Sequence, residues 1–321
     1  MDSMGDPEFR DIEAAAERIA AHTRRTPLLD SPDLSERFGL QVTFKCENLQ
    51  QAGAFKSRGA VNAVFALAED AARRGVATHS SGNHAAALAR AAQRRGIPAF
   101  IVMPRGAPRV KREAVERFGG RVIECAPTLK AREAAAAELV AETGATLVHP
   151  YDNALVIAGQ GTIALELAAA AERPDAVLVP VGGGGLLAGT ALAVRRLWPG
   201  TRVIGVEPAG ADDAARSFAS GELQPQPDPH TIADGLRGAM SERTLRLARR
   251  NVDAIVTVEE PSIVGAMRLL FERLKLVVEP SGAVPVAALL ERAIDARRVI
   301  VVLSGGNVDL DALPWAAVDP L

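Results

Sequence analysis

The sequence is poor in cysteine and has no surplus of charge of one sign. Its 321 residues contain two cysteines, Cys46 and Cys125, each inside an apolar, strand-like segment. This pattern favours buried, reduced thiols over a disulfide framework. Lysine and arginine total 37 against 39 acidic residues, which gives a net charge of -2. Because no broad basic field is present, we expect no nucleic-acid partner.

Long apolar runs are also missing. None reaches the length of about 20 residues that a membrane-spanning helix needs. The N-terminus lacks the charged and apolar regions of a signal peptide, so we expect a cytoplasmic protein without a membrane partner. Residues 1–9, MDSMGDPEF, contain a second methionine and resemble an expression scar. We therefore leave them out of the expected fold.

What is present is a repeated alternation of short apolar and Ala-rich helical segments. The share of hydrophobic residues, 48%, is typical of a globular protein. Strands are predicted at 42–46, 76–79, 99–103, 121–125, 146–149, 176–181, 203–206, 254–258 and 299–303. Helices are predicted at 12–22, 61–72, 85–95, 110–118, 129–143, 161–171, 186–198, 262–274 and 283–293. This order predicts an α/β fold with parallel strands and crossover helices.

One lysine is the first candidate for chemistry. Lys56 lies in the segment AFKSRGA, directly after Phe55 and before a helical pattern. An enzyme would place an amine for covalent chemistry at such a point. The alternative is that Lys56 is one of 37 basic residues on a solvated surface. This short motif does not decide between the two interpretations.

Three loops that follow predicted strands have unusual compositions. In parallel α/β sheets, ligands bind beyond the carboxyl ends of the strands. The loop at 80–84, SSGNH, suits a carboxylate, although helix capping by Ser81 or Asn83 also explains it. The loop at 304–307, SGGN, places a hydroxyl where it could meet a ring nitrogen, or it is a simple turn.

The remaining loop has four consecutive glycines at 182–185. Such a run is entropically costly unless the backbone must approach a ligand closely or adopt positive φ. A phosphate at a helix N-terminus is the ligand we expect, and a tight turn is the weaker alternative. One cofactor, pyridoxal phosphate, needs all of these features. It requires a lysine for its aldehyde, a loop that binds its phosphate and a partner for its ring nitrogen, and the carboxylate-binding loop would hold the amino acid.

These motifs carry a family resemblance. The segment 45–60 (KCENLQQAGAFKSRGA), with the loops at 80–84, 182–185 and 304–307, resembles the serine/threonine dehydratase and serine racemase family. The family consists of fold type II pyridoxal phosphate enzymes, similar to the tryptophan synthase β chain. The resemblance implies parallel sheets with helices on both faces and a homodimer. It also implies a large cofactor-binding domain, 10–74 plus 153–321, and a small substrate-binding domain, 75–152.

The resemblance also implies roles for single residues. Lys56 would bind the cofactor covalently, and Ser304 would face its pyridine nitrogen. Ser81 would stand opposite the lysine, where racemases place a second catalytic residue. The other cofactor contacts would be Phe55, Asn83, Gly182, Gly183, Gly184, Gly185 and Leu186. The substrate contacts would be Ser80, Ser81, Gly82, Asn83, His84 and Arg132.

The family's divalent-cation site matches Glu207, Ala211 and Asp213, two carboxylates and a carbonyl. These hard oxygen ligands suit Mg²⁺ or Ca²⁺. A solvated acidic helix start is the alternative interpretation.

As a reaction, the resemblance implies α,β-elimination from L-serine or L-threonine to a 2-oxo acid and ammonia, with Lys56 as the base. Two departures bear on the substrate: Ala86 replaces a common Gln, and Tyr151 replaces the Asn of animal racemases. The alternatives are serine racemisation through Ser81 and elimination from threo-3-hydroxyaspartate. From another class, the chain could be a non-catalytic protein that binds pyridoxal phosphate or amino acids.

Overall fold

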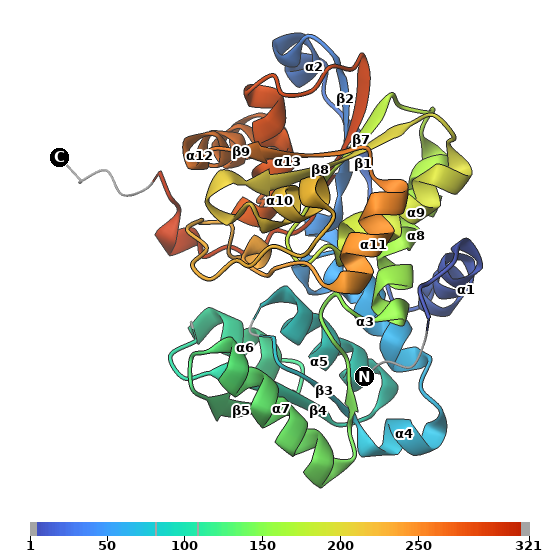
Figure 1. Ribbon diagram of the computed structural model, residues 1–321, viewed down its shortest axis with the longest axis vertical. Helices are drawn as coiled ribbons and strands as arrows, with labels where there is room; N and C mark the ends of the chain where they lie inside the picture. The colour runs from blue at the N-terminus through green and yellow to red at the C-terminus, as the bar shows by residue number, and fades with distance from the viewer. Residues whose placement is uncertain (1–4, 81, 108, 316–321) are drawn as a thin grey trace, which may run out of the picture.

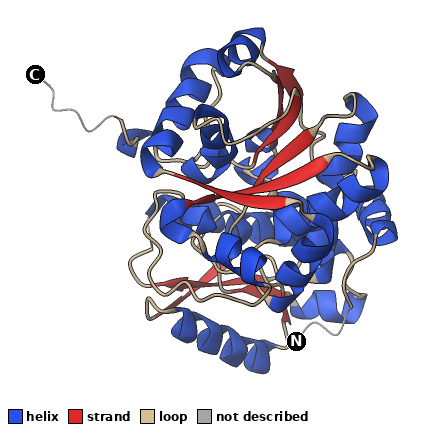
Figure 2. Cartoon of the chain, turned by 45° about the horizontal axis from the view of Figure 1, so that its top comes forward, coloured by secondary structure: helices blue, strands red, loops and turns tan. Residues whose placement is uncertain are grey.

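The computed structural model describes residues 5–80, 82–107 and 109–315. These residues form two lobes, one with a six-stranded sheet and one with a four-stranded sheet (Figures 1 and 2). The larger sheet has the order β1-β2-β10-β7-β8-β9. Its strands are β1 Leu28–Asp30, β2 Gln41–Cys46, β7 Ala176–Pro180, β8 Arg202–Pro208, β9 Ala254–Val258 and β10 Arg298–Leu303. Neighbours from β2 to β9 pair in parallel, and β1 pairs with β2 antiparallel.

The smaller sheet has the order β5-β4-β3-β6, with all described pairs parallel. Its strands are β3 Val76–Thr78, β4 Ala99–Pro104, β5 Arg121–Cys125 and β6 Thr146–Leu147. All four come from residues 76–147, whereas the larger sheet takes strands from both flanking parts of the chain. This arrangement supports the proposed domain division of 75–152 against 10–74 plus 153–321.

The larger sheet is covered on both faces. Along β7, Val177 and Val179 belong to one hydrophobic cluster and Leu178 to another. In β10, Ile300 belongs to the same cluster as Val177 and Val179, and Val301 belongs to the cluster of Leu178. Neighbouring residues of a strand point to opposite faces, so helices must pack on both sides. The helices are α1 Phe9–Ile19, α2 Pro32–Phe38, α3 Lys56–Phe65, α4 Glu69–Arg74, α5 Asn83–Arg95, α6 Arg109–Glu116, α7 Leu129–Thr143, α8 Ala154–Ala170, α9 Gly185–Leu197, α10 Asp213–Ser220, α11 Glu242–Asn251, α12 Glu260–Leu269 and α13 Pro280–Leu290.

The predicted strands and most predicted helices are confirmed, but some helix bounds are wrong. The expected helix at 61–72 is split into α3 and α4, because the Arg95 guanidinium binds the Val64 carbonyl in the last turn of α3 and the Leu67 carbonyl between the two helices. Helix α8 begins at Ala154 rather than at 161, since the Asn153 side chain caps it, accepting from the Val156 amide at 3.0 Å. Helices α2, α10 and α11 were not predicted, because their sequences are short and polar.

Residues 6–9 belong to the packed structure, although the sequence led us to leave them out of the fold. Phe9 begins α1 and packs against the cluster that lines α8 and α9. The Asp6 carboxylate forms a bidentate pair with Arg246 of α11, at 2.6 and 2.9 Å. Among the described residues, no helix is both long and apolar enough to cross a membrane.

Candidate active site

Lys56 begins α3, in a turn that is docked on the loop after β10. The Phe55 amide donates to the Ser304 carbonyl at 3.0 Å, and the Gly306 amide donates to the Gly53 carbonyl at 2.9 Å. Gly53 has φ +73°, and a Cβ there would lie 2.1 Å from the Asn307 side chain. The local sequence thus permits a close contact that brings the lysine segment and the 304–307 loop into one place, with Ser304 buried.

The Lys56 amine lies in a poorly solvated position. Its Nζ donates to the Pro150 carbonyl at 2.8 Å. Burial disfavours the charged form and lowers the pKa of Lys56 to about 8, against the opposing effect of the Glu279 carboxylate. The amine is therefore much more often neutral than that of a surface lysine. This geometry argues against the solvated-surface interpretation.

The glycine loop joins β7 to the start of α9. Gly184 has φ +85°, which a residue with a side chain rarely adopts. A Cβ at Gly183 would lie 2.4 Å from the Tyr151 ring, and one at Gly182 would lie 2.8 Å from the Leu236 Cα. Gly185 and Leu186 form the first turn of α9, where backbone amides lack intrahelical acceptors. The loop is thus a closely packed helix start that suits a phosphate.

The 80–84 loop meets the 304–307 loop through Asn83. The Asn83 Nδ2 donates to the Glu279 carboxylate at 2.7 Å, and its Oδ1 accepts from Asn307 at 2.9 Å. Glu279 is buried, and burial raises its pKa to about 8. The sequence analysis missed this carboxylate, although its place in the segment EPSG at the start of α13 was a signal.

The remaining residues of that loop differ in their placement. Ser81 lies outside the described residues. The Ser80 hydroxyl accepts from the Gly82 amide at 3.4 Å, and both residues are half-buried. The His84 ring is buried and lies 3.1 Å from the Val148 carbonyl, and burial holds its pKa well below the usual value. The His84 side chain is therefore a neutral group that joins α5 to the 148–151 segment.

A group of rings lies beside the Lys56 amine. The His149 ring makes edge contacts with His79 and Tyr151, with centroid distances of 5.2 and 4.6 Å. Burial lowers the pKa of His149 to about 3, and its Nδ1 accepts from the Asp152 amide at 2.9 Å. Burial, and after it the charge of Arg132, lower the pKa of His79.

Arg132 itself is half-buried on α7. Its charge acts on both His79 and Tyr151, so the guanidinium is near this group of rings. Across residues 5–80, 82–107 and 109–315, no carboxylate pairs with it and no side-chain hydrogen bond holds it. Within the described chain, Arg132 therefore offers a guanidinium without a hydrogen-bonded carboxylate beside neutral rings, although the Glu133 charge acts on the same two rings in the opposite sense.

The predicted cation ligands also lie together. Glu207 is the penultimate residue of β8 and accepts from the amides of Ala214 and Ala215 at 3.0 and 2.8 Å. The Asp213 Oδ2 accepts from the Met240 amide at 3.2 Å, while its buried Oδ1 has no partner. Burial raises the pKa of Glu207 to about 8 and that of Asp213 to about 6.

Ala211 is buried in the turn between these two carboxylates. No group of three or more His, Cys, Asp or Glu side chains forms a metal site within the described chain, so any site here depends on the backbone carbonyl. Two buried carboxylates, one with an orphaned oxygen, are a donor set that fits a hard dication. They do not fit a solvated helix start.

Comparisons with known proteins agree with this geometry. Residues 19–305 match the model of a family described as pyridoxal-phosphate dependent enzymes. A β-hydroxyaspartate dehydratase of Paracoccus denitrificans is 50% identical, over 96% of this chain and 99% of the relative. A serine racemase of Arabidopsis thaliana is 48% identical, over 94% and 93%. The solved structure of maize serine racemase has a TM-score of 0.94 and 43% identity, covering 97% of both chains.

Proposed function

Because this chain belongs to the family of pyridoxal-phosphate dependent enzymes, we propose that it converts a β-hydroxy amino acid to a 2-oxo acid and ammonia. The observation that carries the proposal is the convergence of a lysine amine of lowered pKa, a glycine-lined helix start and a buried serine loop. When bound, pyridoxal phosphate supplies an electron-withdrawing ring that acidifies the Cα–H bond of an amino acid.

Different residues of the site would bind different parts of pyridoxal phosphate. Lys56 would bind its aldehyde, and the amides of Gly182 to Leu186 would hold its phosphate. The buried Ser304 hydroxyl would meet the ring nitrogen, and Asn83 and Phe55 would contact the ring. Because Glu279 and Asn307 both hold the Asn83 amide, its orientation is fixed before any ligand arrives.

In the reaction, the Lys56 Nζ would take the proton from the substrate Cα. An amine of pKa about 8 is a suitable base near neutral pH, because about a tenth of it is unprotonated at pH 7, far more than of a lysine with the ordinary pKa of 10.5. The Cβ–O bond then breaks, and the hydroxyl leaves as water with the proton that the Lys56 Nζ took from Cα. The unsaturated amine that is released reacts with water to give the 2-oxo acid and ammonia, so one water is lost and one is consumed.

Arg132 favours a substrate with a second carboxylate. L-serine and L-threonine need one carboxylate site, which the 80–84 loop would supply, whereas 3-hydroxyaspartate needs another. The unpaired guanidinium near Tyr151 and His79 suits that carboxylate. A relative named β-hydroxyaspartate dehydratase supports the same substrate. We therefore propose 3-hydroxyaspartate as the preferred substrate, with L-serine and L-threonine as the others.

One experiment tests the reaction and the substrate together. The purified enzyme is given L-serine, L-threonine and 3-hydroxyaspartate, and 2-oxo acid, ammonia and the chirality of the remaining substrate are measured. We expect oxo acid and ammonia in equal amounts, and Arg132→Met should lower kcat/KM for 3-hydroxyaspartate at least about tenfold more than for L-serine. Inversion without ammonia would favour racemisation through Ser81, and binding without turnover would favour a non-catalytic role.

We propose Mg²⁺ or Ca²⁺ as the ion held by Glu207, Asp213 and the Ala211 carbonyl. This site is joined to the phosphate loop, because the Met240 amide binds Asp213 and a Cβ at Gly184 would lie 2.7 Å from the Met240 Cε. Chelation should therefore lower the melting temperature and the affinity for pyridoxal phosphate, and added Mg²⁺ should restore both. Glu207→Gln should show no response to Mg²⁺, and an unchanged response would contradict the site.

A cytoplasmic homodimer without a nucleic-acid or membrane partner is part of the same proposal. The thiols of Cys46 and Cys125 are free and buried, which suits a reducing compartment. The homodimer follows from the family resemblance, and light scattering of the purified chain tests it.

A further inference from the structure

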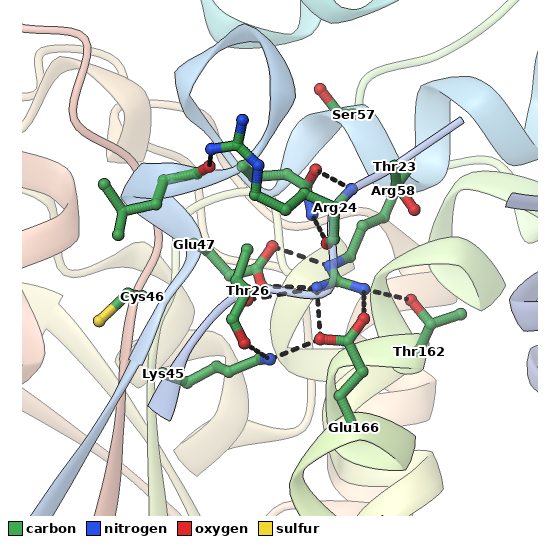
Figure 3. A network of polar contacts seen from close by, with 12 residues as sticks. Thr23, Arg24, Thr26, Lys45, Cys46, Glu47, Ser57, Arg58, Thr162 and Glu166 are labelled. Atoms are coloured by element: carbon green, nitrogen blue, oxygen red, sulfur yellow. Dashed lines mark hydrogen bonds and ion pairs between the residues drawn. The ribbon is translucent and has the colours of Figure 1, made fainter. Parts of the chain in front are cut away.

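A buried network of charged side chains lies two residues beyond Lys56 on α3 (Figure 3). At its centre, the Arg58 guanidinium is fully buried and binds two carboxylates. It donates to Glu47 through Nε at 2.8 Å and Nη2 at 2.7 Å. It donates to Glu166 of α8 at 2.7 and 3.0 Å and to the Thr162 hydroxyl at 3.2 Å. Both carboxylates are thus bound in a bidentate manner, the geometry that fixes an arginine most firmly.

Lys45 completes the network from β2. Its Nζ donates to Glu166 at 2.5 Å and to the Thr26 carbonyl at 2.8 Å. Two cations therefore face two carboxylates, and the network is neutral as a whole. Burial alone would lower the pKa of Arg58, but Glu47 and Glu166 outweigh it and raise the pKa. Because Arg58 stays protonated, it takes no part in proton transfer. We therefore look for its role in holding other residues in place.

Helix α8 stands between the two helices that carry the proposed cofactor contacts. It meets α3 at a glycine pair, since a Cβ at Gly159 would lie 2.6 Å from the Gly59 Cα. It meets α9 at another pair, since a Cβ at Gly189 would lie 2.8 Å from the Gly161 amide nitrogen. Helix α3 begins with Lys56 and α9 begins in the glycine loop. The position of the lysine relative to that loop is therefore transmitted through α8.

Glycine contacts allow close approach but specify no register along a helix, because they are not directional. Directional contacts between α3 and α8 supply that register. The Gln160 Oε1 accepts from the Gly59 amide at 3.1 Å, and the Asn62 Nδ2 donates to the Leu155 carbonyl at 2.7 Å. The bidentate contact of Arg58 with Glu166 adds two charge-assisted hydrogen bonds to them.

We propose that Arg58 is a positioning residue, whose network with Glu47, Glu166 and Lys45 holds the first turn of α3 on α8 and so aligns Lys56 with the phosphate loop. The inference depends on the proposed role of Lys56, but not on which amino acid is the substrate.

The test compares two ligands of the apoenzyme. Pyridoxal 5′-phosphate can bond to the lysine, whereas 4′-deoxypyridoxine 5′-phosphate has the same ring and phosphate but no aldehyde. Arg58→Lys keeps the charge but loses the fork that binds both carboxylates. We expect Arg58→Lys to lower the ratio of the affinity for pyridoxal phosphate to the affinity for the deoxy analogue at least tenfold, with both affinities measured by calorimetry. An equal loss for both ligands, or no loss, would overturn the proposal.

A matched control comes from the other end of α3. Arg95 binds the Val64 carbonyl in the last turn of that helix and the Leu67 carbonyl just beyond it, the latter at 2.7 Å. Arg95→Lys should lower the melting temperature but leave the affinity ratio unchanged. A shift in the ratio with Arg95→Lys as large as with Arg58→Lys would mean that any loosening of α3 suffices, and it would overturn the specific role.

Two milder variants keep the test decisive where Arg58→Lys fails to fold. Glu166→Gln and Thr162→Val each remove one arm of the network and preserve side-chain size, and both should shift the ratio in the same direction. Borohydride reduction of the wild-type complex fixes the cofactor on the lysine that holds it, and peptide mass analysis identifies that residue. Attachment to a residue other than Lys56 would overturn both the proposed role of Lys56 and the positioning role of Arg58. Attachment to Lys56 together with an unchanged affinity ratio in the variants would overturn only the positioning role.

Discussion

Lys56 and Arg58 are two cations in the first turn of one helix, yet their surroundings are opposite. Arg58 faces two carboxylates and is fully buried, and its pKa is raised. Lys56 has a backbone carbonyl as its hydrogen-bond acceptor, and burial lowers its pKa to about 8. A buried guanidinium that carboxylates bind stays charged and has a fixed orientation, whereas a buried amine whose hydrogen-bond acceptor is a neutral carbonyl is more easily deprotonated. This difference is why we propose a positioning role for Arg58 and a catalytic role for Lys56.

The largest expected effect comes from removing the amine. Lys56→Ala should lower turnover by at least about 10³-fold, because both the covalent attachment and the base are lost. The absorption band of the lysine-bound cofactor should disappear as well, which a spectrum of the purified protein would show. Lys130→Ala, at an exposed position on α7, is the control and should change neither. Oxo acid production by Lys56→Ala would contradict the assignment.

The next effect concerns stability rather than chemistry. Arg58→Met should lower the free energy of unfolding by about 3–5 kcal/mol, because two buried carboxylates lose their shared partner. Urea unfolding of the apoenzyme measures this loss. The matched control is Arg73→Met, which breaks an exposed pair with Asp70 and should cost less than about 0.5 kcal/mol. Equal losses in the two variants would show that the network is not a stabilising unit.

A smaller effect should appear in the pH dependence of cofactor uptake. Since the neutral amine is the form that attacks an aldehyde, the rate of bonding to Lys56 should rise with pH through about 8 and level off above it. Between pH 7 and pH 9 the neutral fraction, and with it the rate, should increase about tenfold. Stopped-flow absorbance of the apoenzyme mixed with pyridoxal phosphate measures it. A midpoint near 10.5 would mean that the amine is solvated.

Much of the fold was predictable because parallel strands that are buried on both faces form nearly continuous apolar runs. The segment at 299–303 is β10, and the segment at 176–181 is β7 with one residue beyond it. The loops at 182–185 and 304–307 were predictable as neighbours, since they follow β7 and β10, and the carboxyl ends of parallel strands share one edge of a sheet. The loop at 80–84 follows β3 of the smaller sheet, so only the packing of the two sheets brings Asn83 to Asn307.

Other features depend on contacts between distant parts of the chain, even where the local segment was a signal, as EPSG was for Glu279. Glu279 contacts Asn83 across nearly two hundred residues of chain, and Arg58 contacts Glu166 across more than one hundred. In the sequence each is an ordinary charged residue beside small or apolar neighbours. The contacts of Asp6 with α11 were missed for the same reason. Pairings of this kind depend on which elements pack together, and periodicity carries no information about that.

By itself, the sequence determined the alternation of strands and helices, the glycine-rich helix start and the placement of Lys56 at the head of a helix. Backbone conformation and apolar periodicity are local properties, and they decide these features. Only the tertiary structure decided which buried charges are compensated, so that Arg58 is held between two carboxylates while burial lowers the pKa of Lys56. Desolvation and Coulomb energies depend on distances between side chains that are far apart in the chain, and folding alone sets those distances.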